Sequence, residues 1–451
     1  MGGRLFTQTP RTLLTEMAHS TVETIDVLRA IDKATGKNLR YLFDQYVYRG
    51  GHPDYSVSYS WDSDSHLAKL MVTQKQVADG KSQVQEGLFD LSIPVGFGYV
   101  DGDSASVQTV SVRVHERQQA FYFPLQKKPD FISFDVGNHT LKTVELEYPL
   151  KELQAQLKYD SDPISRLYAA KAIAKKGTLE AVETLSQALV NDSFWAVRAE
   201  VAEALATIQL SQAVAELLTG LDDNHPKVRR AVVTALAGVK TAKSYKALKS
   251  VVKQGDESYY VEGAAATALG KVGASTLENG KNKEKKTLRL LEAVLEDRAG
   301  WNEVVRSGAI GGLSMFKSSE QALDILLPYT KIGTPQALRL TAIRALGKIS
   351  LGQSQTVCDR ILDRLAAIAR EEFFLTQVSV VIALGQMQVS GAVRVLQGLA
   401  EQSPDGRVKR RAEEAMGKVR KAIGADKAVG ELRQDLDELK QLNRDLKSRL
   451  E

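Results

Sequence analysis

The sequence holds a single cysteine, no long apolar run and no secretory leader, and each of these absences excludes a class of protein. Because Cys358 has no second cysteine to pair with, no internal disulfide can form, and nothing points to an oxidising compartment. No run of about 18 apolar residues occurs, which excludes a membrane-spanning helix. The first residues lack an apolar region followed by a small-residue cleavage site. We therefore expect a cytoplasmic protein that does not enter a membrane, with Cys358 as a small buried side chain.

A strong charge of one sign is also missing. The net charge is +5 over 451 residues, whereas a dedicated nucleic-acid binder has basic residues gathered on one face and a domain pI above about 9. The densest basic segment, 407–421, also contains Glu413 and Glu414 and has no aromatic residue on which a base could stack. We interpret it as a solvated helix face. The sequence therefore does not favour nucleic acid as a partner.

The hydrophobic pattern changes twice along the chain. Residues 1–52 carry apolar side chains at helical spacing, with Thr21 as the expected N-cap and Gly36 as a C-cap and turn. Residues 53–150 alternate between apolar and polar, with turn signals between short runs. We predict strands at the following ranges: 55–61, 67–73, 89–94, 107–114, 119–123 and 143–148. About seven short strands at this spacing predict a small antiparallel β-sandwich, in which Gly96-Phe97-Gly98 forms a bulge or turn.

A repeat with helical period fills residues 151–424. Each copy has an anchor residue, then small residues, then an apolar residue seven positions after the anchor. The anchors are Arg166, Arg198, Arg229, Glu262, Arg306, Arg339, Gln377 and Lys409. Two helices of about 12 residues with two turns need this repeat length, and one helical hairpin cannot bury its apolar faces alone. The repeats resemble HEAT repeats, including the HEAT-like repeats of bilin lyases, and predict an α-solenoid with one inserted basic loop at 273–286.

The last segment, 429–451, has a heptad pattern. Apolar residues spaced alternately by three and four, with an asparagine in one slot, form the expected seam: Val429, Leu432, Leu436, Leu439, Asn443, Leu446 and Leu450. One interpretation is a short coiled coil that makes a homodimer, which a single Asn at a core position favours. The other is a helix that caps the last repeat. The complete prediction is a multidomain α+β protein with four parts: 1–52, 53–150, 151–424 and 429–451.

A motif at the start of the sandwich resembles a known family. The segment Phe43-Asp44-Gln45-Tyr46-Val47-Tyr48-Arg49-Gly50-Gly51-His52-Pro53 resembles the stretch that closes the catalytic domain of aminopeptidase-N-type zinc metallopeptidases. In that family the stretch leads into a β-sandwich. The strand that ends at residues 70–76 also resembles the sandwich's L-x-V-x-Q-x-Q hairpin. The resemblance implies that 1–52 is the tail of a catalytic domain, and that Phe43, Asp44, Gln45, Tyr48, Gly51, His52 and Pro53 are structural.

The catalytic elements of that family have no counterpart in the sequence. Zinc peptidase chemistry needs two His four residues apart on one helix face with a Glu general base between them, but no two of the six His have this spacing. The closest imitation is His115-Glu116, which lies in an expected strand. Phosphate-loop, nucleophile-elbow and paired-cysteine motifs are also missing. We therefore expect no catalytic residue, no metal ligand and no cofactor in this chain, with zinc only in a catalytic domain absent from it.

These observations lead to one principal interpretation and two alternatives. The chain is interpreted as the non-catalytic C-terminal part of an aminopeptidase-N-like metallopeptidase, which supports a separate catalytic chain or binds a protein or peptide through its solenoid. The first alternative is a stand-alone HEAT-repeat scaffold for protein binding. The second is a bilin lyase-like protein, which rests on the repeats alone and finds no support in residues 1–150.

Overall fold

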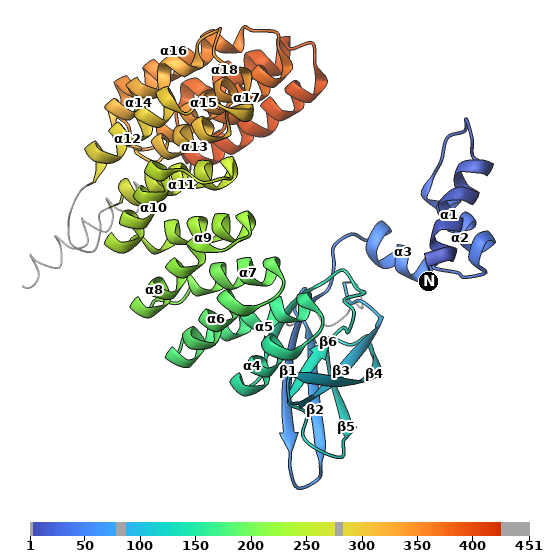
Figure 1. The fold of residues 1–451 in the computed structure, drawn as a ribbon. Coiled ribbons are helices and arrows are strands. Elements are labelled where there is room, and N and C mark those ends of the chain that lie inside the picture. The colour runs from blue at the N-terminus through green and yellow to red at the C-terminus, as the bar shows by residue number, and fades with distance from the viewer. Residues whose placement is uncertain (1–2, 78–86, 276–282, 425–451) are drawn as a thin grey trace, which may run out of the picture. The chain divides into compact units, whose positions relative to one another are not determined.

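The protein divides into two compact units, Met1–Lys176 and Gly177–Glu451. A computed structural model describes residues 3–77, 87–275 and 283–424 (Figure 1). The first unit contains short helices, two β-sheets and one helical hairpin, and the second contains a run of helical hairpins. The predicted fold class, sheets followed by an all-α repeat region, is confirmed. The heptad seam at 429–450 and residues 276–282 of the predicted insertion lie outside the described residues.

The N-terminal segment is helical, as its apolar spacing predicts. Its elements are α1 (Gly3–Glu16), α2 (Thr24–Thr35), α3 (Arg40–Phe43) and the π-helical turn η1 (Asp44–Tyr48). The expected cap at Thr21 is wrong, because α2 begins after Glu23, whose backbone N–H donates to the carboxylate of Asp26 at 3.1 Å. Gly36 ends α2 in the left-handed conformation that glycine adopts without strain, as predicted.

Seven strands of the described residues form the sandwich. They are β1 (Asp54–Asp62), β2 (Leu67–Gln74), β3 (Leu91–Asp101), β4 (Ser104–Val114), β5 (Gln118–Pro124), β6 (Phe131–Phe134) and β7 (Thr143–Glu147). One sheet has the order β5-β2-β1-β7 and the other β4-β3-β6. The sandwich is mixed and not purely antiparallel, because β7 pairs with β1 in parallel, with Asp54 opposite Thr143. The short strand β6 was missing from the predicted set.

Alternate side chains of the strands fill the space between the two sheets. Tyr55 and Val57 of β1, and Ile93, Val95 and Phe97 of β3, are fully buried. Each such side chain contributes about 1.5–3 kcal/mol relative to an exposed one. The polar residues between them face outward, which explains the period of two in the sequence.

The expected bulge at residues 96–98 is wrong. Gly96 and Gly98 lie inside β3, where they pair in regular register with Thr109 and Val107 of β4. The ring of Phe131 lies directly over Gly98, so that a Cβ atom there would overlap with the ring. Glycine is therefore required for close packing and not for a turn.

Helical hairpins occupy the rest of the chain. The first hairpin, α4 (Leu150–Tyr159) with α5 (Pro163–Lys176), belongs to the first unit. In the second unit the first helices of successive hairpins are α6 (Leu179–Asn191), α8 (Ser211–Thr219), α10 (Ala242–Gln254), α12 (Glu284–Asp297), α14 (Glu320–Leu326), α16 (Gln355–Ala369) and α18 (Ser390–Gln402). The second helices are α7 (Trp195–Leu205), α9 (Pro226–Val239), α11 (Tyr259–Gly273), α13 (Val304–Leu313), α15 (Gln336–Ile349), α17 (Phe374–Leu384) and the helical residues 406–424.

The second helices form one continuous layer. Each of α7, α9, α11, α13, α15 and α17 packs against the next in this order, and Figure 1 shows α7, α9 and α11 side by side. Small residues allow the closest approach, which lies between α11 and α13. A Cβ atom on Gly308 would overlap with the backbone of Gly263, and the hydroxyl of Thr267 donates across the interface to the carbonyl of Gly308 at 2.9 Å. Among the described helices, none combines the length and apolarity that a bilayer crossing needs.

Candidate binding surfaces

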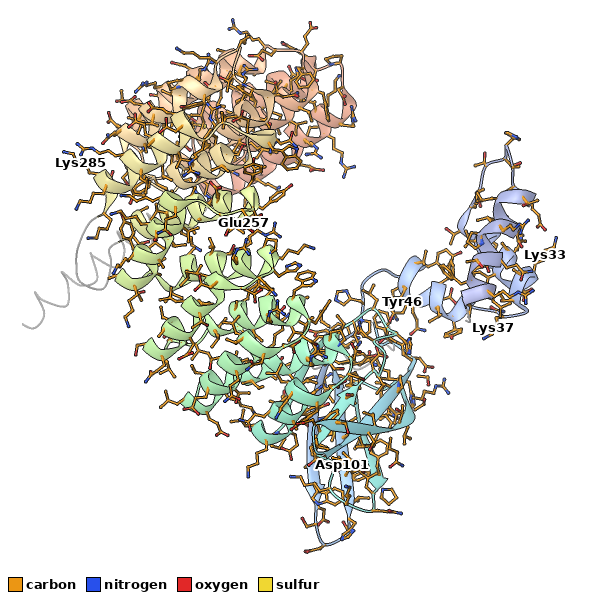
Figure 2. The ribbon with its side chains drawn as sticks, viewed as in Figure 1. Lys33, Lys37, Tyr46, Asp101, Glu257 and Lys285 are labelled. Atoms are coloured by element: carbon orange, nitrogen blue, oxygen red, sulfur yellow. The ribbon has the colours of Figure 1, made fainter. Side chains whose placement is uncertain are left out.

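The segment that resembles the peptidase motif connects the N-terminal helices to the sandwich. The side-chain amide of Gln45 pairs with the backbone of Asp90 in both directions: its oxygen accepts from the N–H at 2.6 Å, and its nitrogen donates to the carbonyl at 3.4 Å. The hydroxyl of Tyr46, which is labelled in Figure 2, donates to the carbonyl of Leu141 at 3.2 Å. Arg49 lies 4.4 Å from the ring centroid of Phe89.

The other motif residues make fewer contacts. Pro53 is buried, and its carbonyl accepts from Thr143 at the start of β7. Asp44, Tyr48, Gly51 and His52 are exposed, and Phe43 is half-buried. Tyr46 and Arg49 were not singled out from the sequence. Their hydrogen-bond partners lie 95 and 39 residues away along the chain, and no local sequence pattern identifies partners at such distances.

The helices before this motif expose a concentration of large apolar side chains. Seven of the nineteen large apolar side chains that are exposed among the described residues fall in the first 52 residues: Phe6, Leu14, Val22, Ile25, Tyr41, Val47 and Tyr48. Within α1 and α2, only Thr9, Ala30 and Ile31 are buried. The two helices pack against each other and leave Phe6, Leu14 and Ile25 exposed, while their other Leu, Ile and Val side chains are half-buried or buried. We call this surface the N-terminal apolar face.

In the solenoid, three of the eight predicted anchors form a ladder of ion pairs between repeats. Arg198 of α7 binds both carboxylate oxygens of Asp223, which precedes α9, at 2.7 and 3.0 Å. Arg229 of α9 binds Asp256, which precedes α11, at 2.8 and 2.7 Å. Arg339 of α15 repeats the arrangement with Glu371. Bidentate arginine–carboxylate pairs hold geometry as well as charge, so each rung sets the position of one repeat against the next.

Each rung also holds the loop of its own repeat. Arg198 donates to the carbonyl of Asp192, and Arg229 donates to the carbonyl of Asp223, both at 2.8 Å. The Asp223 carboxylate accepts in addition from the backbone N–H of His225 at 2.7 Å. Burial on its own would raise the pKa of Asp223, but the hydrogen bonds from Arg198 and His225 outweigh it and hold that pKa below its ordinary value. The pKa of Asp256 is lowered in the same way.

Two rungs depart from the pattern near the insertion. In α11 the charges are reversed, and the anchor Glu262 accepts from Arg298 at 3.2 Å. In α13 the anchor Arg306 pairs with Glu303 of its own repeat at 3.0 Å. The buried Nε of Arg306 has no hydrogen-bond partner among the described residues. Both departures occur at the anchors on either side of the step of 44 residues.

Exposed apolar side chains in the second unit gather at one place in the repeat. Seven of its nine large exposed apolar residues lie within four residues of the first residue of a second helix: Phe194, Tyr259, Tyr260, Trp301, Ile332, Phe373 and Leu375. Because these helix starts succeed one another along the layer, the side chains recur from repeat to repeat. We call this edge of the layer the apolar rim. Its positions were not predicted, because they lie two to seven residues before the anchors and outside the anchor pattern.

A groove of about 900 Å³ lies between α17 and the helical residues 406–424. Arg407 stacks over the ring of Phe374 at 4.0 Å and pairs with Asp405 at 2.7 Å, and the same contact lowers the pKa of Asp405 to about 2. Arg410 pairs with Glu414 at 2.9 Å. The basic segment 407–421 thus lines a groove at the end of the repeats, and part of its charge is neutralised locally.

The titratable groups singled out in the sequence are not gathered into a reactive site. Cys358 is buried, as predicted; its thiol donates to the carbonyl of Ser350 at 3.4 Å, and burial raises its pKa. The Nδ1 of His115 lies 3.3 Å from the carbonyl of Arg113 at the end of β4. Within residues 3–77, 87–275 and 283–424, no group of three or more His, Cys, Asp or Glu side chains is placed to hold a metal ion.

Comparisons with known proteins agree with the repeat pattern. The family described as HEAT repeats matches residues 150–225, 214–301 and 333–417, which together make up just over half of the chain. No curated protein matches. Among solved structures, the chain is similar to aminopeptidase A of Legionella pneumophila in complex with aspartic acid, with 13% identity and a TM-score of 0.47 over 92% of this chain. The chain spans 55% of the length of that aminopeptidase.

A second similar structure is human deoxyhypusine hydroxylase in complex with glycerol. The identity is 20% and the TM-score 0.28, and the match covers 60% of this chain and 96% of the other.

Proposed function

Because this chain belongs to the HEAT-repeat family and carries a helical-repeat scaffold, we propose that it supports a separate catalytic domain of the aminopeptidase-N type. In this proposal the chain is the non-catalytic C-terminal part of such a metallopeptidase. The catalytic domain, which supplies zinc and the general base, binds to the N-terminal apolar face. The observation that carries the proposal is the concentration of exposed apolar side chains in the first 52 residues.

The N-terminal apolar face has the physical properties of a surface that is covered in an assembly. Exposed apolar patches larger than a few hundred Å² are rare on monomers and mark binding sites. Covering Phe6, Leu14 and Ile25 would each contribute up to about 1.5–3 kcal/mol. The residues of 43–53 that contact the sandwich attach this face to the rest of the unit, so a domain bound there is held in a defined position. The resemblance of the same segment to the peptidase family names the class of partner.

Binding of the full chain to a recombinant catalytic domain of this family, one that carries H-E-x-x-H, tests the proposal. We expect a saturable complex in analytical ultracentrifugation, weakened at least tenfold by Leu14→Glu with Ile25→Glu. Val190→Glu is the matched control, since Val190 of α6 is 64% exposed and Leu14 is 72% exposed. A complex that is insensitive to the first pair of substitutions, or no complex with any such domain, would contradict the proposal.

The alternative is a stand-alone scaffold that binds protein or peptide through its repeats. The apolar rim and the groove at residues 374–418 favour it, since neither involves the N-terminal face. A stand-alone scaffold should be folded and monodisperse without a partner, whereas an unpartnered N-terminal apolar face should promote association. Sedimentation velocity of the purified chain over a range of concentrations separates the two.

A further inference from the structure

We propose that the start of α7, α9, α11 and α13 is a recognition site for a proline-rich peptide in the polyproline II conformation. Four side chains at these helix starts form the site, which we call the aromatic strip: Tyr260 and Trp301 of the apolar rim, together with Trp195 and His225. This proposal concerns the second unit alone and does not depend on a catalytic partner.

Contacts between neighbouring repeats make the aromatic strip continuous. The rings of Trp195 and His225 are stacked, with centroids 4.8 Å apart and an interplanar angle of 6°. The guanidinium of Arg230 on α9 lies 5.8 Å from the ring centroid of Tyr260 on α11. Tyr260 in turn meets Trp301 edge to face at 6.0 Å. Aromatic rings and cations thus follow one another across four consecutive second helices.

The backbone around Trp301 holds its side chain toward solvent. Asn302 and Glu303 both have positive φ, at 48° and 56°, which is a strained conformation for residues other than glycine. Trp301 is 55% exposed, although indole is among the largest apolar side chains. The carboxylate of Glu303 pairs with Arg306 and secures the turn. A strained turn that presents a large ring to water is more typical of a contact site than of a packing element.

The spacing of the aromatic strip matches a polyproline II helix. The four rings form two close pairs, Trp195 with His225 and Tyr260 with Trp301. Packed helices lie about 8–10 Å apart, so the two pairs, which are two helices apart in the layer, are separated by about 16–20 Å. A polyproline II helix rises about 3.1 Å per residue with three residues per turn, which places every third side chain on one face about 9 Å apart. A peptide with an apolar residue or proline at every third position can therefore place two of them, six residues and about 19 Å apart, at the two ring pairs.

The hydrogen-bonding chemistry agrees with the same ligand. The backbone of a polyproline II peptide makes no internal hydrogen bonds, so its carbonyls need donors from the partner. The hydroxyls of Tyr259 and Tyr260 and the indole N–H of Trp301 have no hydrogen-bond partner in the part of the chain that the structure describes. Aromatic faces for the proline rings and free donors for the carbonyls are the two elements of polyproline recognition.

Charge favours such a peptide over single-stranded nucleic acid, which also stacks on aromatic rings. Seven acidic and six basic residues lie in the segments that form the strip: 192–198, 222–230, 254–262 and 298–306. The resulting net charge of −1 does not attract a phosphate backbone. Next to Tyr259, a groove of about 970 Å³ contains the exposed carboxylates of Asp222 and Glu257, and Glu257 is labelled in Figure 2. These carboxylates suit an Arg or Lys at one end of the peptide.

Fluorescence anisotropy with the full chain tests the proposal. The probe is a labelled peptide of two Arg followed by four Leu-Pro-Pro repeats, and the control peptide has Gly in place of every Pro. We expect saturable binding of the proline peptide and at least tenfold weaker binding of the glycine peptide. Binding should fall at least tenfold in Tyr260→Ala and in Trp301→Ala, because buried aromatic anchors dominate interfaces. Intrinsic tryptophan fluorescence should shift on binding in the wild type and less in Trp301→Ala.

Tyr122→Ala is a closely matched control for Tyr260→Ala. Tyr122 on β5 is 56% exposed and lies 5.8 Å from the Nζ of Lys69, while Tyr260 is 50% exposed and lies 5.8 Å from Arg230. We expect Tyr122→Ala to leave peptide binding unchanged. Circular dichroism checks that each variant is folded. If Trp301→Ala does not fold, Trp301→Leu, which keeps apolar bulk but removes the aromatic ring, takes its place.

Glu257→Gln tests the charged end of the site. It should weaken the Arg-headed peptide about two- to fivefold, the range of an exposed ion pair, and leave a peptide headed by two Gln unchanged. Four results would overturn the proposal: no saturable binding of the proline peptide, equal binding of the glycine peptide, binding insensitive to Tyr260→Ala and Trp301→Ala, or displacement of the peptide by a 20-nucleotide oligothymidylate.

Discussion

The two units hold their charged groups in different ways. In the first unit one ion pair is deeply buried on both sides: Lys142 and Asp135 pair at 2.6 Å with both side chains almost fully shielded, and Asp135 also accepts from Thr140. In the second unit partly buried rungs such as Arg198–Asp223 and Arg229–Asp256 recur from repeat to repeat. Breaking the pair in the first unit therefore leaves a charge fully buried, whereas the solenoid distributes partly buried pairs over several repeats. The following predictions test this contrast.

The largest effect should come from the buried pair of the first unit. Lys142→Met leaves the Asp135 carboxylate buried without its cation and should lower the free energy of unfolding of that unit by about 3–5 kcal/mol. Urea denaturation measures the change. Lys75→Met, which removes one of the two partly exposed lysines that pair with Glu145, is the control and should cost no more than about 1 kcal/mol. Equal losses in the two variants would show that burial does not distinguish these pairs.

A rung of the ladder should matter less than the buried pair. Arg229→Met removes hydrogen bonds to Asp256 and to the carbonyl of Asp223, and we expect a loss of about 1.5–3 kcal/mol, the range for a hydrogen bond to a charged group. In hydrogen exchange, the backbone amides of α9 and α11 should lose the most protection, because each repeat contacts only its neighbours. Arg306→Met, which breaks an ion pair within one repeat, should leave hydrogen exchange in α9 and α11 unchanged. A loss spread evenly over the second unit would argue against the ladder.

A substitution at the close contact between α11 and α13 tests the contribution of packing instead of that of charge. Gly308→Ala places a methyl group against the backbone of Gly263 and should destabilise the second unit by about 1–3 kcal/mol. Gly238→Ala in α9 is matched in chemistry, but nothing lies within 4 Å of the added Cβ, so it should stabilise by about 0.5–1 kcal/mol. Thermal denaturation should therefore show shifts of opposite sign. Shifts of the same sign would mean that the helices do not approach as closely as described.

The smallest effect is the pH dependence of a single rung. The pKa of Asp223 is lowered in the folded state, so its contribution to stability is complete above the pKa of the unfolded chain, about 3.9, and is lost as pH falls through the folded value. In Asp223→Asn the free energy of unfolding should be lower at neutral pH and should fall less steeply below pH 5, by up to about 1.4 kcal/mol per pH unit. Urea denaturation at several pH values measures the slope. An unchanged slope would contradict the lowered pKa.

The repeats were more predictable than the sandwich because their signal is local and recurs. The spacing of Arg198, Arg229 and Arg339 marked each second helix, although nothing near these residues named Asp223, Asp256 or Glu371 as partners. In the sandwich, β6 escaped detection because all four of its residues are buried, which removes the alternation that reveals a strand. Thr21 was chosen as a cap from its residue type, whereas Glu23 takes that place through Asp26.

The candidate surfaces also differ in how far they could be predicted from the sequence. The motif at 43–53 could be recognised from the sequence, but its main contacts, Tyr46 with Leu141 and Arg49 with Leu88, join residues far apart in the chain. The apolar rim has no motif of its own. Its members are aromatic and aliphatic residues at or just before the starts of second helices, and those of different repeats become neighbours only when these helices stack.

The sequence by itself determined the order of the parts: helical segment, sandwich and HEAT-type repeats, because apolar periods of two and 3.6 are properties of neighbouring residues. It also determined that glycine and small residues would line the repeat helices. Only the tertiary structure decided which carboxylate each anchor binds, why Gly98 is glycine, and which aromatic side chains meet at the rim. These depend on the distance between helices and strands that are remote in sequence, and that distance is set by packing of the whole unit.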